Sequence, residues 1–259
     1  GEVHRAQHIP LGVRSRLRLY AAQCILKLAT CDAYASLILP RMGRLSYALQ
    51  DECFQVRMHL LHDLLLYLMR NELPTEFHAA IFLVAFDPED EPRVQVASYT
   101  RRLQVLPPIV RHERLERIIV RFLHLLAHHP DLNVESPQTM CSFSRYLEFY
   151  LACVACEANV GVLARFTACV RTYIDLSLSE PSVENSRPLY AMAELAQFLI
   201  QRLADNHGWT IYPVDEEAPC PTDILRSTGT VARSVLDGEV WELLQQQPRR
   251  HRDKKTKVA

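Results

Sequence analysis

The stretch Leu73–Pro88, LPTEFHAAIFLVAFDP, constrains the fold of this chain more than any other segment. Pro74 suits the first turn of a helix, where its missing N–H is not needed. The residues that follow are apolar on nearly every side, and Asp87-Pro88 ends the helix because the residue before a proline avoids the α region. A helix that is apolar all round is buried between neighbours. We therefore expect residues 74–86 to form a buried helix within a stack of helices.

Apolar residues recur at helical spacing on both sides of this segment. The predicted helices cover residues 13–28, 40–49, 51–70, 91–106, 112–127, 137–157, 160–177 and 188–205, with a short one at 239–246. The chain has only 7 glycines and no clear run of alternating apolar and polar residues. Both features favour helices, and we predict a fold without a sheet.

A repeat of about forty residues connects these helices. Val13-Arg14 and Val56-Arg57 occupy similar positions, and Arg93-Val94 follows in a related setting. Asp51-x4-Val56-Arg57 resembles the helix pair of a HEAT repeat, whose period is about 40 to 47 residues. In such a pair we expect the aspartate to cap the second helix and the arginine to reach the same turn of the next repeat. The predicted fold is an all-α HEAT-repeat α-solenoid, a right-handed superhelix of antiparallel helix pairs.

The motif residues to which we assign this structural role are Asp51, Val56, Arg57, Pro74, Phe82, Asp87 and Pro88. Around the predicted solenoid, residues 13–206, we expect an irregular lead-in at 1–12 and an irregular extension with a short helix at 207–247. Residues 248–259 are expected to form a disordered basic tail. Because the sequence has no initiator methionine and begins just before a helix, we interpret it as a piece of a longer protein.

Charge is distributed unevenly along the chain. Residues 249–259 carry a net charge of +5, whereas the whole chain carries −1. The basic residues of this tail are Arg249, Arg250, Arg252, Lys254, Lys255 and Lys257. They favour either a contact with nucleic acid, a nuclear import signal or a solvated linker, and no aromatic residues that would stack on bases lie among them. No apolar run reaches the ~18 residues of a membrane span, so no membrane partner is expected.

Two groups of side chains are candidate chemical sites. His124 and His128 share a helix face, but the glutamate of a zinc-protease motif is absent between them, so we interpret them as helix-end residues beside the closing carbonyls. Cys153 and Cys156 lie within a predicted helix and have no second cysteine pair at zinc-finger spacing, so we interpret them as core residues. The sequence predicts no catalytic residues, no bound metal and no cofactor.

An ordered series of motifs resembles one family. The series runs Asp51-Glu52-x-x-Gln55-Val56-Arg57, Leu73-Pro74-x-Glu76-Phe77-x-Ala79-x-Ile81-Phe82, Asp87-Pro88, and His124-Leu125-Leu126-Ala127-His128-x-Pro130-Asp131, with Leu189-Tyr190 in a late helix. It is similar to the C-terminal HEAT-repeat region of the cohesin-regulatory family named for precocious dissociation of sisters. The resemblance covers about residues 13–215, and residues 222–259 match nothing in it.

The resemblance implies a non-enzymatic, chromatin-associated nuclear scaffold that acts in sister chromatid cohesion. Proteins of the family bind the kleisin subunit of the cohesin ring, and they work with the releasing factor and the cohesion-establishment acetyltransferase. Two alternatives stay open from the sequence. One is a HEAT scaffold of another system, either a condensin-type subunit or a nuclear transport receptor. The other is a helical nucleic-acid binder that makes weak DNA contacts through its basic tail.

Overall fold

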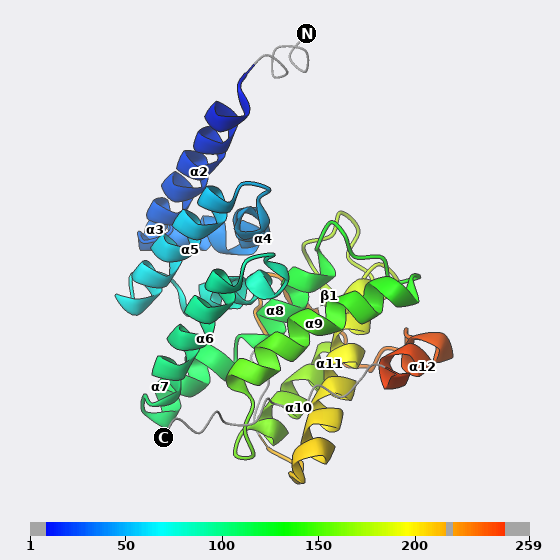
Figure 1. Ribbon diagram of the computed structural model, residues 1–259. Coiled ribbons are helices and arrows are strands. Elements are labelled where there is room, and N and C mark those ends of the chain that lie inside the picture. The colour runs from blue at the N-terminus through cyan, green and yellow to red at the C-terminus, as the bar shows by residue number, and fades with distance from the viewer. Residues whose placement is uncertain (1–8, 216–219, 247–259) are drawn as a thin grey trace.

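The computed structural model describes residues 9–215 and 220–246 of the chain (Figure 1). Most of the described chain is helical, and consecutive helices pack side by side as an α-solenoid of the HEAT type. The first helices lie at one end of the molecule, and helices α8 to α11 lie at the other. None of the described helices is both long enough and apolar enough to cross a lipid bilayer.

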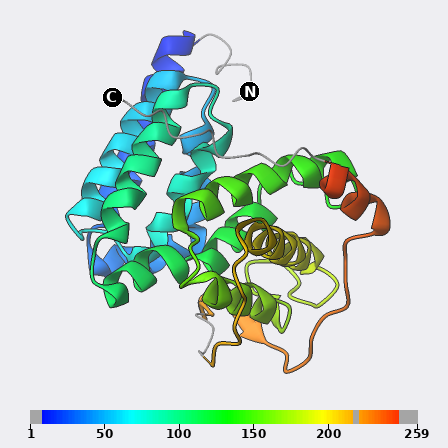
Figure 2. The same ribbon diagram turned by 60° about the horizontal axis from the view of Figure 1, so that its bottom comes forward.

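Three long helices run alongside one another in the first half of the chain (Figure 2). They are α2 (Leu11–Leu28), α5 (Phe54–Met69) and α6 (Asp90–Gln104). Helix α5 contacts α2 on one side and α6 on the other. Between α2 and α5 lie the short helices α3 (Asp32–Ile38), η1 (Leu39–Arg41), α4 (Met42–Ser46) and η2 (Tyr47–Gln50). The helices predicted from the sequence leave out residues 29–39, where α3 forms.

The apolar segment after Pro74 is buried as predicted, but it is not an α-helix. It forms a 3-10 helix, η3 (Thr75–Phe86), in which nine consecutive residues, Phe77 to Ala85, are buried. A 3-10 helix rises about 2.0 Å per residue against 1.5 Å for an α-helix, so these residues span a longer path between their neighbours. Helices α4, α5, α6, α8 and α9 all contact η3, which places it at the centre of the stack.

The chain after α6 contains five more helical segments ahead of the long helix α11 (Arg187–His207). These are α7 (Pro108–Arg111), the π-helical turn η4 (His112–Glu116), α8 (Ile119–Ala127), α9 (Pro137–Val154) and α10 (Val160–Val170). Helix α11 packs against α8, α9 and α10. The single helix predicted over residues 112–127 is therefore divided, with its π-helical turn ahead of α8.

The expectation of a fold without a sheet is wrong in one place. Strand β1 (Tyr173–Asp175) pairs antiparallel with β2 (Leu225–Ser227). Residues 160–177 were predicted to be one helix, but α10 ends at Val170 and the chain turns into β1. Strands of three residues are too short to show an alternating pattern, and the pairing joins segments about fifty residues apart in sequence.

The C-terminal extension contains β2 and a short helix, and it is anchored to the solenoid. Its chain runs around the outside of the helices to α12 (Gly238–Gln246), which packs against α9 (Figure 2). The buried carboxylate of Glu194 accepts hydrogen bonds from the backbone N–H groups of Val235 and Leu236 at 3.0 and 3.1 Å, and from the Ser234 hydroxyl at 2.9 Å. Gly161 permits a second close approach, since a Cβ there would lie 2.6 Å from the Tyr212 carbonyl oxygen.

Helix α2 has apolar residues on two faces. Ala22 and Leu26 pack into the core. Leu17 and Tyr20 belong to an apolar stripe at helical spacing that also includes Val13, Cys24 and Leu28, and they are exposed, Tyr20 to 62%. The spacing of that stripe predicted the helix correctly. Helix α2 packs against α5 through the face that carries Ala22 and Leu26, because its neighbouring helices in the described chain lie on that side.

Phe82 provides a test of the buried centre. Its side chain is 0% exposed and contacts the rings of Phe122, Phe149 and Tyr150, with centroids 4.9 to 6.3 Å apart. We expect Phe82→Ala to lower the free energy of unfolding by about 3–5 kcal/mol, because the cavity it leaves cannot fully collapse. The measurement is urea unfolding followed by circular dichroism.

The control is Ile109→Ala, which also removes apolar atoms but at a position that is 79% exposed. We expect this control to change the free energy of unfolding by less than about 0.5 kcal/mol. A loss below about 1 kcal/mol for Phe82→Ala would show that η3 is not the packed centre of the molecule.

Candidate functional site

Arginine side chains link the turns that precede successive long helices. The Nε and Nη2 atoms of Arg57 donate to the carboxylate of Asp87 at 2.7 and 3.2 Å, and its Nη1 donates to the Asp51 carbonyl oxygen at 2.8 Å. Arg57 and Asp87 are both buried. Arg93 in turn donates to the Asp87 carbonyl oxygen. Arg57 therefore joins the turn before α5 to the turn before α6, as the repeat pattern predicted.

The same link occurs one helix earlier, with a correction to the predicted residues. Arg18 of α2 donates to the two carboxylate oxygens of Asp51 at 2.6 and 2.9 Å, so Arg18 and not Arg14 fills the arginine position there. Asp51 is also not the N-cap of α5. The N-cap is Cys53, and Asp51 instead accepts a hydrogen bond from the Cys53 N–H at 2.8 Å within the turn. We call the links made by Arg18, Arg57 and Arg93 the arginine–aspartate ladder.

The other motif residues frame η3. Val56 is buried on α5, Pro74 is the N-cap of η3, and Phe82 is buried at its centre. Asp87 follows the last residue of η3 and carries the ladder, whereas Pro88 is exposed. These residues hold the stack together, and they do not converge on a pocket that could accept a ligand.

Acidic side chains line the turns that the ladder joins. Helix α8 ends beside the turn before α5, because the Nε2 of His129 donates to the Gln50 side-chain oxygen at 2.7 Å. The exposed acidic residues of this region are Glu52 and Glu89 on the turns before α5 and α6, Asp90 and Glu91 at the start of α6, and Asp131 and Glu135 between α8 and α9. We call this group the acidic ridge. Its charge agrees with the net negative charge of the chain ahead of residue 249.

Two other charges expected on the surface are buried. Glu116 is 3% exposed and accepts hydrogen bonds from His112 at 2.6 Å and from Asn159 at 2.9 Å. Arg121 is also 3% exposed and makes a bidentate pair with Asp223 at 2.8 and 2.9 Å. Their positions on a predicted helix lead us to expect, from the sequence alone, that both charges face outward towards a partner. The C-terminal extension instead covers Arg121 through Asp223. They hold the fold and are unavailable to a partner.

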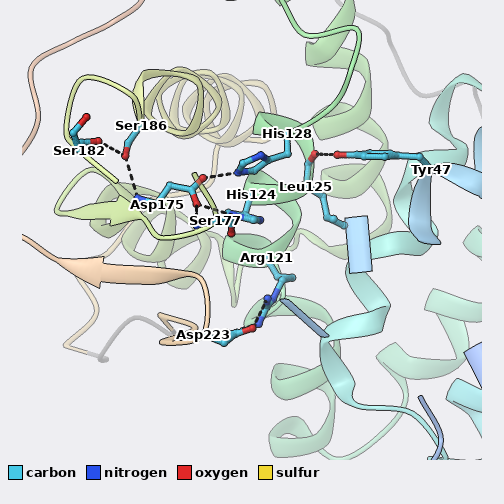
Figure 3. A network of polar contacts seen from close by, with 10 residues as sticks. All are labelled: Tyr47, Arg121, His124, Leu125, His128, Asp175, Ser177, Ser182, Ser186 and Asp223. Carbon is cyan, nitrogen blue, oxygen red and sulfur yellow. Dashed lines mark hydrogen bonds and ion pairs between the residues drawn. The ribbon is translucent and has the colours of Figure 1, made fainter. Parts of the chain in front are cut away.

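A polar network surrounds the C-terminal half of α8 (Figure 3). The Nε2 atoms of His124 and His128 both point at the carboxylate of Asp175 in β1, at 3.2 and 2.6 Å. The sequence interpretation had these rings beside the closing carbonyls of the helix, whereas their Nε2 atoms reach across to another element. Ser177 donates its backbone N–H to the same carboxylate at 2.8 Å.

Burial and hydrogen bonding fix the protonation of this network. Burial by itself would raise the pKa of Asp175, but the hydrogen bonds from His124 and His128 outweigh it and lower that pKa below its ordinary value. Burial also lowers the pKa of His124, despite the neighbouring carboxylate. At neutral pH the network therefore contains an ionised Asp175 and a neutral His124.

The remaining predicted residues fall into two groups. Cys153 is buried near the end of α9, and burial raises its pKa to about 11, which keeps it a thiol. Cys156 lies beyond the last residue of α9, so the pair is not within one helix as predicted. The basic tail residues Arg249 to Lys257 lie outside the described part of the chain.

Stacked helices that repeat about every forty residues define a class of protein, the HEAT-repeat solenoid. Comparison with protein families gives the particular one. The model of the family described as "Sister chromatid cohesion protein PDS5 protein" matches residues 1–226. The chain therefore belongs to this family.

Individual relatives agree with this assignment. The chain is 27% identical to the sister chromatid cohesion protein pds5 of Schizosaccharomyces pombe over 227 residues, 87% of this chain and 18% of the relative. It is 23% identical to PDS5 of Saccharomyces cerevisiae over 255 residues, 90% of this chain and 20% of the relative. A third relative, PDS5 homolog A of Danio rerio, is 34% identical over 51% of this chain. The chain thus spans about a fifth of the length of the two yeast relatives.

His78 is a buried histidine of η3 whose protonation makes the stability of the fold depend on pH. Its ring donates from Nδ1 to the Thr75 carbonyl oxygen at 2.7 Å and accepts at Nε2 from the Tyr99 hydroxyl at 2.9 Å. Burial lowers the pKa of His78 to about 4, because the charged ring would lose its hydration. Burial also lowers the pKa of His129.

We expect acid to destabilise the chain. The unfolded chain binds a proton at His78 near its ordinary pKa of about 6.5, whereas the folded chain does so only near pH 4. The free energy of unfolding should therefore fall by about 1.4 kcal/mol per pH unit for this group between pH 6.5 and 4. Urea unfolding at a series of pH values measures it. His78→Gln should reduce the slope of the unfolding free energy against pH by the contribution of about one proton. If the free energy of unfolding of the wild type stays constant or rises on acidification, the assignment is wrong.

Proposed function

We propose that this chain forms a rigid, non-enzymatic arm of a nuclear regulator of cohesin, and that it acts in sister chromatid cohesion. Membership of the PDS5 family is the observation that carries this proposal. The names of the relatives assign them to sister chromatid cohesion, and this role is proposed here for the chain. The proposed partners are the kleisin subunit of cohesin, the releasing factor and the cohesion-establishment acetyltransferase.

The structure supports a scaffold role through its rigidity and its surface. Buried η3 and the arginine–aspartate ladder hold the helices in one register, so the surface they present is fixed. Repeat solenoids bind partners along such extended surfaces. The family match removes the support for a condensin-type subunit or a nuclear transport receptor, which the sequence had left open.

The acidic ridge is the contact surface that we propose for a basic segment of a cohesin subunit. Three of its residues, Glu89, Glu91 and Asp131, have no arginine or lysine partner among the ion pairs of the described chain. They are therefore available to cationic groups of another protein. Complementary charge mainly sets the rate and the specificity of association, so several residues have to be changed together to weaken binding clearly.

The test is a charge reversal on the ridge. The variant Glu89→Lys, Glu91→Lys, Asp131→Lys should weaken binding of the purified chain to reconstituted cohesin by at least tenfold. Biolayer interferometry measures the affinity, and circular dichroism checks that the helices remain. The effect should diminish at high salt, because exposed charges are screened.

A matched control changes the net charge equally at exposed acidic residues outside the ridge. This control is Glu157→Lys, Glu180→Lys, Asp205→Lys, all at exposed positions. We expect it to bind within twofold of the wild type. The proposal is wrong if the wild-type chain does not bind cohesin, and the ridge is not the contact surface if both variants bind equally.

A further inference from the structure

Three metal-ligating side chains converge between α8 and β1 (Figure 3). One ring nitrogen of His124, one of His128 and a carboxylate oxygen of Asp175 lie within 4.8 Å of one another. His124 and Asp175 are almost fully buried, with side chains 8% and 3% exposed, whereas His128 is 31% exposed. This cluster is the one group of three or more such residues with this geometry in the described part of the chain.

The arrangement has the chemistry of a transition-metal site. Histidines four residues apart on a helix place both rings on one face, which is the spacing used by zinc-binding helices. Bonds of 2.0 to 2.2 Å to a tetrahedral ion separate its ligand atoms by about 3.3 Å. The Nε2 atoms lie 3.2 and 2.6 Å from the Asp175 oxygens, so small side-chain rotations make room for an ion. Two imidazoles exclude magnesium and calcium, which prefer oxygen ligands.

The charge of the Asp175 carboxylate also favours a bound cation. Asp175 is a buried carboxylate whose ion-pair partners in the described chain are these two histidines, and neither an arginine nor a lysine reaches it. The described chain therefore offers this almost fully buried carboxylate no permanently charged cationic partner. A buried charge is costly unless an opposite charge balances it. A divalent cation supplies that charge.

The groups behind the carboxylate hold it in position. Ser177 donates its N–H to one Asp175 oxygen at 2.8 Å, and its hydroxyl lies 3.1 Å from Nε2 of His124. The Asp175 N–H donates to the Ser186 hydroxyl at 3.0 Å, and that hydroxyl donates to the Ser182 carbonyl oxygen at 2.6 Å. Such outer contacts orient metal ligands and raise the affinity for the ion.

We propose that His124, His128 and Asp175 bind one zinc-class divalent cation, which ties α8 to β1. Both imidazoles coordinate through Nε2 and carry their proton on Nδ1, and the carboxylate gives up the two hydrogen bonds that it accepts from them. The exposed side of His128 is the entry path and leaves the fourth coordination position to water. The ion fixes two segments that are 47 residues apart, so its role is structural.

The proposal is tested by titrating the whole chain with Zn²⁺ after treatment with a chelator. Isothermal titration calorimetry should show that the wild-type chain binds one zinc ion. The affinity for zinc should fall at least tenfold in His128→Gln and in Asp175→Asn. Both substitutions keep the size of the side chain close to the original, and circular dichroism checks the fold. Zn²⁺ should also raise the thermal midpoint of the wild type more than that of either variant.

The chain offers a matched control for adventitious binding. His59 and His62 are exposed histidines on one helix, α5, and the double variant His59→Gln, His62→Gln should bind zinc as the wild type does. Substitution of Co²⁺ separates the site from the eight cysteine thiols, because thiolate ligands give a near-ultraviolet charge-transfer band that imidazole and carboxylate ligands do not. The proposal is overturned if the wild type binds no zinc, or if His128→Gln and Asp175→Asn bind as much as the wild type.

Discussion

The burial of η3 on every side is the constraint on which the rest of the structure depends. A 3-10 helix of twelve residues has poorer hydrogen bonds than an α-helix and is uncommon at this length, so neighbouring helices have to stabilise it. Five α-helices of the described chain, together with the short helices η2 and η4, pack against it. The surfaces of these helices are therefore fixed relative to one another, which a protein that presents an extended binding surface requires.

Polar bonds at the turns set the register of that stack. Apolar contacts are non-directional and would tolerate small shifts between helices, whereas the pairs Arg18–Asp51 and Arg57–Asp87 each fit one geometry. The ladder occupies the turns, where the acidic ridge is also displayed. Packing inside and polar bonds at the edge thus jointly fix the position of the surface that we propose for a partner.

Much of this could be predicted from the sequence, because it depends on local patterns. The helical periods, the burial of η3 and the Arg57 link all follow from spacing within one or two repeats. The α-helical form of η3, the N-cap role of Asp51 and the exposure of Glu116 and Arg121 were predicted wrongly. Partners far along the chain decide these cases, as Asp223 does for Arg121. The convergence of Asp175 with His124 and His128 was not predicted for the same reason. Asp175 follows His128 by 47 residues, in a strand too short to show a pattern.

Native-state hydrogen exchange tests the central position of η3 most directly. Amides of Thr75–Phe86 that donate hydrogen bonds should exchange only when the whole chain unfolds, with an opening free energy equal to that from urea unfolding. Amides of α12, at the edge of the molecule, should exchange through local opening at a lower free energy. The account would be contradicted if η3 exchanged as readily as α12, or opened while α5 and α6 remained protected.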